Sequence, residues 1–183
     1  MFKFYQVIII IALSFSAAGA EENLDMNEVH IQVRDGVVYC DVQAFQQEAY
    51  ILKVIGSGSP MTVIWQFEVE QVRDYWLDKQ VVSVRLGRQV IPDLVTQRWL
   101  MRDLSGGVVR HTTDAQEAMQ FLTGLTQAAV LDVSILDVEN TYVLNTRFFL
   151  YEGEAEEDTW IPLLRNSGID MGNVPLPLAT TDD

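Results

Sequence analysis

The sequence predicts an α+β domain: a mainly antiparallel β-sheet of about eight strands with two packed helices. Stretches in which apolar and polar residues alternate recur along the chain with short turns between them, as in consecutive hairpins. Two segments, 42–55 and 113–125, instead repeat their apolar residues with the period of a helix. The order hairpin, helix, hairpin therefore occurs twice, and each helix is expected to pack on the sheet.

The longest hairpin is predicted over Met61–Val90. Its two limbs carry apolar residues at every second position: Val63, Trp65, Phe67 and Val69, then Val82, Val84 and Leu86. Pairing residues whose numbers sum to about 153 places Glu68 opposite Arg85 and Phe67 opposite Leu86, and both pairs are chemically sensible. We therefore expect Trp65 and Phe67 to be buried and Glu68 to form a cross-strand ion pair.

The segment before this hairpin predicts a tight turn and a helix. Asp35-Gly36 lies between two alternating stretches, and Asp-Gly there is a strong signal for a two-residue hairpin turn. In the helix over 42–55, Asp41 is the expected N-cap and Gly56 the left-handed C-terminal stop.

After the long hairpin the pattern restarts. Strands are expected at Val95–Asp103, Val108–His111, Ala128–Leu136 and Tyr142–Leu150. Between them, Thr113 and Gln116 have the spacing of a capping box at the start of the second helix. The last two strands are expected to pair with each other as a hairpin.

The two ends of the chain are predicted to lie outside the domain at 21–165. Residues 1–20 have a short basic start, an apolar run and an Ala-Gly-Ala site before Glu21, as in a cleaved secretory signal peptide. The alternative is an uncleaved anchor that tethers the protein to the inner membrane, although the apolar run is short for a span of ~20 residues. Residues 166–183 are rich in Gly, Pro, Thr and Asp and are predicted to be a flexible tail.

Charge and cysteine content narrow the classes of partner. The net charge is -14, and removing the signal peptide removes Lys3 and no acidic residue, which gives -15. Such a chain is repelled by nucleic acid and by anionic lipid, so neither is expected as a partner, and the mature domain is not expected to be membrane-embedded.

The single cysteine, Cys40, excludes an internal disulfide and is expected to be a buried thiol.

No catalytic, cofactor or metal motif is apparent, so the protein is expected not to be an enzyme. His30 and His111 lie on separate predicted strands and lack the spacing of metal ligands. The acidic run at 152–158 lacks the register of a calcium loop and is expected to be a solvated loop. No serine lies in a G-x-S-x-G elbow.

The tip of the long hairpin is the predicted partner-binding site, formed by Arg73, Tyr75, Trp76 and Asp78. Tyr, Trp and Arg are the residue types that concentrate binding energy in protein interfaces. A turn that only reverses the chain would favour Asn, Gly or Asp. The alternative is that Trp76 packs on its own domain, against the apolar patch around Trp160, and that Asp78 caps the turn.

Several motifs together resemble a known family. They are R-D-Y-W-L-D (73–78), V-R-L-G-R-Q-V-I-P-D-L-V-T-Q-R-W (84–99), L-S-G-G (104–107), A-Q-E-A-M-Q-F-L-T-G-L (115–125) and Y-V-L-N-T-R-F-F-L (142–150). Over roughly residues 27–165 the chain resembles short exported proteins of Gram-negative bacteria that are catalogued as a domain of unknown function. Their R-x-Y-W-x-D tip is matched by Arg73, Tyr75, Trp76 and Asp78. Their genes tend to lie near a membrane sensor kinase of the nitrogen-regulation type, so the resemblance implies a link to envelope signalling and no activity.

The leading functional hypothesis is therefore a non-enzymatic periplasmic interaction protein with an envelope protein as its partner. The alternative is a small-molecule binding protein whose ligand lies between the sheet and the helices, since curved antiparallel sheets commonly enclose such sites. A pocket in the structure would favour the second hypothesis, and an exposed aromatic tip would favour the first. The sequence does not determine the ligand, the partner or the oligomeric state.

Overall fold

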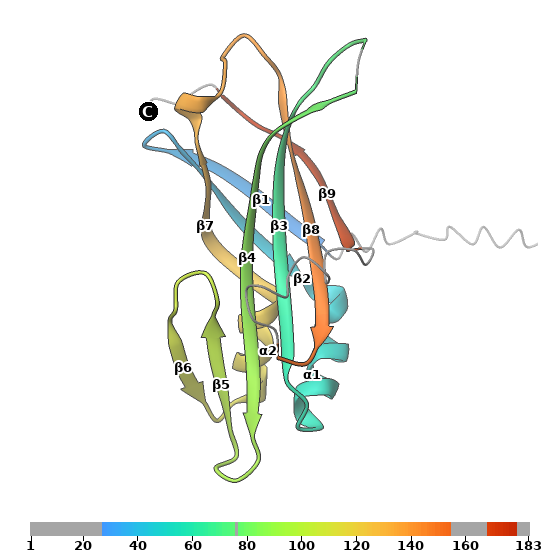
Figure 1. Ribbon diagram of the computed structural model, residues 1–183, viewed down its shortest axis with the longest axis vertical. Coiled ribbons are helices and arrows are strands. Elements are labelled where there is room, and N and C mark those ends of the chain that lie inside the picture. The colour runs from blue at the N-terminus through green and yellow to red at the C-terminus, as the bar shows by residue number, and fades with distance from the viewer. Residues whose placement is uncertain (1–26, 76, 155–167, 179–183) are drawn as a thin grey trace, which may run out of the picture.

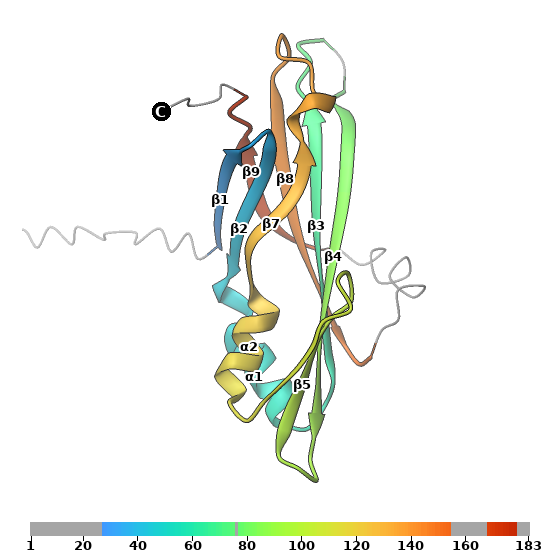
Figure 2. The same ribbon diagram turned by 90° about the vertical axis from the view of Figure 1, so that its left-hand side faces the viewer.

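A computed structural model describes residues 27–75, 77–154 and 168–178. Within these residues the chain forms nine strands in two sheets and two α-helices, which confirms the predicted α+β class. Figure 2 shows that the elements form two layers. A six-stranded sheet makes up one layer, and a three-stranded sheet continued at one end by the two helices makes up the other.

The three-stranded sheet has the order β1-β2-β7, with antiparallel neighbours (Figure 1). Its strands are β1 (Asn27–Arg34), β2 (Val37–Ala44) and β7 (Gly124–Asp132). The predicted tight turn between β1 and β2 is confirmed. Asp35 and Gly36 have φ angles of 51° and 74°, the left-handed conformations that a type I′ turn requires.

The six-stranded sheet has the order β6-β5-β4-β3-β8-β9 and is also antiparallel. Its strands are β3 (Met61–Gln71), β4 (Lys79–Asp93), β5 (Arg98–Asp103), β6 (Val109–Thr112), β8 (Tyr142–Glu152) and β9 (Ile169–Pro175). β3 pairs with β4 on one side and with β8 on the other over its whole length, so it lies at the centre of the sheet.

The register of the β3–β4 hairpin differs from the prediction. Phe67 pairs with Val84 and Glu68 with Ser83, so the predicted partners Leu86 and Arg85 are each two residues away. A shift of two residues leaves every side chain on its predicted face, because strand side chains alternate with a period of two. Alternation alone therefore does not distinguish the two registers. The predicted ion pair is wrong: Glu68 instead accepts a hydrogen bond of 2.6 Å from Gln66 Nε2.

The first helix begins later than predicted. A short 3₁₀ turn η1 (Phe45–Gln47) leads into α1 (Glu48–Gly56). Asp41 is not its N-cap, because β2 continues to Ala44 and the Asp41 carboxylate accepts a hydrogen bond of 2.6 Å from Gln127 N. Val42 and Ala44 are buried and continue the alternation of β2, so residues 42–44 form the end of a strand and not the start of the predicted helix. Gly56 is the last helical residue, and the left-handed φ of 88° belongs to Gly58.

The second helix, α2 (Ala115–Thr123), is capped one residue later than predicted. Asp114 is the N-cap, and its Oδ1 accepts a hydrogen bond of 2.8 Å from Gln116 N. Thr113 is not the cap, because β6 extends to Thr112, whose hydroxyl accepts a hydrogen bond of 3.0 Å from Asp114 N. α1 and α2 contact each other, and both contact β4.

The predicted final hairpin is wrong. β7 pairs with β2 in the three-stranded sheet, whereas β8 pairs with β3 in the six-stranded sheet. The 3₁₀ turn η2 (Val133–Ile135) and the loop that follows carry the chain from one layer to the other. The predicted order of hairpin, helix and hairpin is therefore present only in the first half of the chain. In the second half, the two strands after α2 join different sheets.

Part of the predicted tail belongs to the sheet. Residues 169–175 form β9, which pairs antiparallel with β8, for example Leu144 with Val174. Met171 and Leu176 are buried, so these apolar side chains anchor the segment despite its glycine and proline content. The predicted domain end at residue 165 lies outside the described residues.

The core lies between the two layers. Trp65 and Phe67 are fully buried, as predicted, and the Trp65 ring lies 4.4 Å from the Phe148 ring between their centroids. Cys40 is also fully buried, and burial followed by the charge of Asp41 raises the pKa of its thiol to about 12. Ile64 and Phe149 form a smaller cluster with Leu104.

Candidate functional site

The predicted tip of the β3–β4 hairpin projects at one end of the molecule (Figure 1). The side chains of Tyr75 and Leu77 are each 92% exposed. The Asp78 carboxylate closes the base of the loop by accepting a hydrogen bond of 3.1 Å from Arg73 N. The structure thus brings Arg73 and Asp78 together and leaves Tyr75 exposed, whereas Trp76 lies outside the described residues.

A second loop lies beside this tip. The loop between η2 and β8 is joined to the base of the hairpin by a hydrogen bond of 2.9 Å from Val72 N to Thr141 O. Its Val138 is 82% exposed, so this loop also displays a large apolar side chain. The two loops diverge beyond this hydrogen bond (Figure 1).

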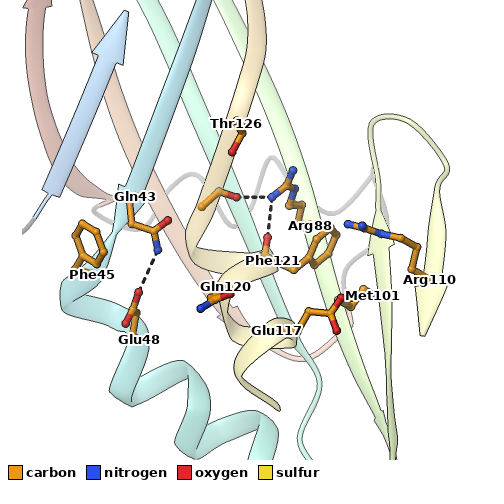
Figure 3. Close-up of a pocket in the computed structure, with 11 residues that line it drawn as sticks. Gln43, Phe45, Glu48, Arg88, Met101, Arg110, Glu117, Gln120, Phe121 and Thr126 are labelled. Carbon is orange, nitrogen blue, oxygen red and sulfur yellow. Dashed lines mark hydrogen bonds between the residues drawn. The ribbon is translucent and has the colours of Figure 1, made fainter. Parts of the chain in front are cut away.

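A cavity of about 510 Å³ lies between the helices and the sheets (Figure 3). Its walls come from the end of β2, from η1, α1 and α2, and from β4, β5, β6 and β7. The lining side chains discussed below are Gln43, Glu48, Arg88, Arg110, Glu117 and Phe121. A volume of this size is ordinary for a small-molecule site.

Arg88 has an unusual position for a charged residue. Val84, Leu86 and Val90 lie at the alternate positions of β4 that pack against the core, and Arg88 occupies the same alternation. Its Nη1 donates to the carbonyl oxygens of Phe121, at 2.8 Å, and of Gly124. These carbonyls end α2, where partial negative charge favours a cation.

Two guanidinium groups contact the Phe121 ring. The Cζ atoms of Arg88 and Arg110 lie 4.6 Å and 5.4 Å from its centroid, within the range of cation–π contacts (Figure 3). Burial, the largest influence, lowers the pKa of Arg88, Asp103 raises it, and Arg110 lowers it again. The two arginines thus repel each other at the cavity wall.

The two carboxylates of the cavity accept hydrogen bonds from neutral side chains. Glu48 accepts a hydrogen bond of 3.1 Å from Gln43 Nε2, and Glu117 accepts one from the Thr112 hydroxyl. Among the described residues, the only ion pair with N–O distance within 4.0 Å joins His30 to Glu28. Neither Arg88 nor Arg110 is therefore neutralised by a direct carboxylate contact within this part of the chain.

Comparison with known proteins places the chain in a family. Residues 21–154 match the model of a family described as Domain of unknown function (DUF4390). The chain belongs to the DUF4390 family. No curated protein and no solved structure matches it. The predicted membership of an uncharacterised family is thus confirmed, and the fold described above is the fold of a DUF4390 domain.

The other candidate residues of this DUF4390 domain are not brought together. His30 bonds Glu28 at 2.6 Å on β1, whereas His111 lies on β6 in the other sheet. Within the described ranges no group of His, Cys, Asp and Glu could hold a metal ion. Of the acidic run, Glu152 accepts a hydrogen bond from the Tyr50 hydroxyl, whereas 155–158 lie outside the described residues. No helix in the described part of the chain is long and apolar enough to cross a membrane.

The candidate site predicted from the sequence comprises the tip residues and does not include the cavity residues. Arg88 carries a signal that could have revealed it, because a charged residue continues the inward alternation Val84, Leu86 in a strand that is otherwise apolar on that face. Arg110 and Val138 carry no comparable signal. Arg110 lies on a local β5–β6 hairpin whose approach to α2 is not stated by its own residues, and the loop of Val138 is joined to a distant segment by the bond from Val72 N to Thr141 O.

Proposed function

We propose that this DUF4390 protein is an exported, non-enzymatic interaction protein that binds an envelope protein through the β3–β4 hairpin tip. The observation that carries the proposal is the 92% exposure of both Tyr75 and Leu77 on a hairpin that projects at one end of the molecule. Removing such side chains from water on binding a partner is favourable, and Tyr anchors are frequent in interfaces. The signal-like residues 1–20 support export to the periplasm, and the implied gene neighbourhood supports a role in sensor-kinase signalling.

A photo-crosslinking amino acid at position 77 tests the proposal in cells. The matched control is the same substitution at position 95, because Val95 is 93% exposed and lies in the β4–β5 turn at the opposite end of the molecule. We expect a discrete crosslinked envelope protein from position 77 that is absent from position 95 and is lost with Tyr75→Ser. Identical crosslinking patterns at the two positions would contradict recognition by the tip.

The export step has its own test. The mature periplasmic protein should begin at Glu21, as determined by N-terminal sequencing or intact mass. A mass that retains Met1 to Ala20 would instead support the tethered alternative.

Small-molecule binding is the second candidate function. The cavity of about 510 Å³ between the helices and the sheets favours small-molecule binding, because the alternative hypothesis from the sequence expects a ligand between the sheet and the helices. The hairpin tip lies at the end of the molecule away from the helices that line the cavity, so the two functions are compatible and can be tested separately.

A further inference from the structure

We propose that the cavity is an anion-binding site that holds the carboxylate or phosphate group of a small molecule between Arg110 and Arg88. This inference rests on the second candidate function, small-molecule binding, and adds the chemical class of the ligand. It does not depend on the hairpin tip.

The first argument is uncompensated positive charge. Arg88 and Arg110 both lie against the Phe121 ring, and no described carboxylate lies within 4.0 Å of either guanidinium group. Asp103, Glu48 and Glu117 lie in the surroundings of the arginines but none makes a direct ion pair with them, so a bound anion would supply the contact that these carboxylates do not make. Arginine is also the side chain best suited to carboxylate and phosphate, because its planar donors match their oxygen atoms.

The second argument is unused donor capacity. Arg110 donates no hydrogen bond to any described residue, so its whole guanidinium group is available to a ligand. Arg88 uses Nη1 to hold the end of α2, while its Nε is buried and has no partner among the described residues. Buried donors of this kind are rare in native proteins and call for an explanation. A bound oxyanion in contact with both side chains would reduce the charge repulsion between them.

The third argument concerns the size of the ligand. The cavity has room for a small organic anion but not for a folded partner. The acidic chain as a whole, with a net charge of -14, repels nucleic acid and anionic membranes. Glu48 and Glu117 on the remaining wall favour a ligand whose other end donates hydrogen bonds rather than one that is anionic throughout.

The experiment is a calorimetric titration of the full mature protein with succinamate, inorganic phosphate and succinamide at physiological salt. Succinamate carries one carboxylate and one amide, and succinamide has nearly the same size and shape but no charge. The test variant is Arg110→Gln, because Arg110 is exposed and supports no other described contact except the Phe121 ring. The matched control is Arg85→Gln, which removes the same charge from the exposed face of β4 outside the cavity.

We expect succinamate or phosphate to bind, whichever carries the preferred oxyanion, and succinamide to bind at least about tenfold more weakly. Arg110→Gln should weaken anion binding about tenfold or more, and Arg85→Gln should leave it unchanged. Equal losses in the two variants would overturn the site, because the effect would then be general electrostatics. Equal binding of succinamate and succinamide would overturn the anion assignment and leave small-molecule binding standing. No binding of any probe would count against both.

Discussion

The two ends of the β3–β4 hairpin are built in opposite ways. Near the helices, β3 is covered on both faces: Trp65 and Phe67 face the core, and Thr62 and Ile64 on the other face are also buried. At the tip, Tyr75 and Leu77 are almost completely exposed. The same hairpin is thus buried along β3 and exposed to solvent at its tip. The difference suggests that stability depends on the base and recognition on the tip, so substitutions should separate the two properties.

The largest expected effect is at the base. Phe67→Ala removes a fully buried aromatic side chain and should lower the free energy of unfolding by about 3–5 kcal/mol, through lost transfer energy and the cavity left behind. Urea unfolding followed by circular dichroism measures this loss. A decrease below about 1 kcal/mol would show that the base of the hairpin is not the stabilising part, and the comparison would fail.

Alkaline pH provides a second test of the enclosed part, at Cys40 on β2. Burial raises the pKa of this thiol to about 12, against roughly 8.5 when unfolded. Above the unfolded pKa the native state binds more protons than the unfolded state, so stability falls as pH rises from about 9 to 12. The loss should approach 1.4 kcal/mol per pH unit and be smaller in Cys40→Ala. Identical pH dependence of the two proteins would show that the thiol ionises without unfolding.

A third, smaller effect distinguishes the observed cap of α2 from the predicted one. Asp114→Ala removes the carboxylate that accepts a hydrogen bond from Gln116 N, and should cost about 1 kcal/mol. Thr113→Ala is the matched control, because Thr113 is exposed and was the cap predicted from sequence. Chemical unfolding of the two variants measures the difference. A greater loss of stability in Thr113→Ala would instead support Thr113 as the N-cap of α2, as the sequence predicted.

Sequence alone predicted the features that depend on local pattern. The Asp35-Gly36 turn, the buried face with Trp65 and Phe67, and the existence of two helices follow from residue type and spacing, and all are present. The predicted tip also had a local signal, two adjacent aromatic residues where a turn favours small polar ones.

What the sequence could not predict depends on pairing between distant segments. β7 and β8 each alternate like strands, but nothing in their own residues states that one pairs with β2 and the other with β3. The same holds for β9, whose glycine and proline content suggests a tail until β8 is seen beside it. The cavity forms where α2, β4 and β6 meet. Only the folded structure therefore shows that Arg88 and Arg110 both contact the Phe121 ring.

The smallest stability effect is expected at the tip, where the comparison is sharpest. Tyr75→Ala and Leu77→Ala remove side chains that are already 92% exposed, so little buried area is lost and the free energy of unfolding should change by less than about 0.5 kcal/mol. For a domain of this size, ~1 kcal/mol shifts Tm by roughly 2–4 °C, so each variant should melt within about 2 °C of the wild type.

Trp76→Ala separates the two roles considered for the tip. If the tip is a recognition element, this variant should also keep its Tm while crosslinking to the envelope partner falls, since burial of a Trp anchor often contributes about 2 kcal/mol or more to binding. Thermal melts and position-77 crosslinking on the same preparations measure both quantities. A Tm lowered by several degrees together with undiminished crosslinking would mean that Trp76 packs on its own domain. The tip would then contribute to stability as the buried part of the hairpin does, and the two ends would no longer differ in role.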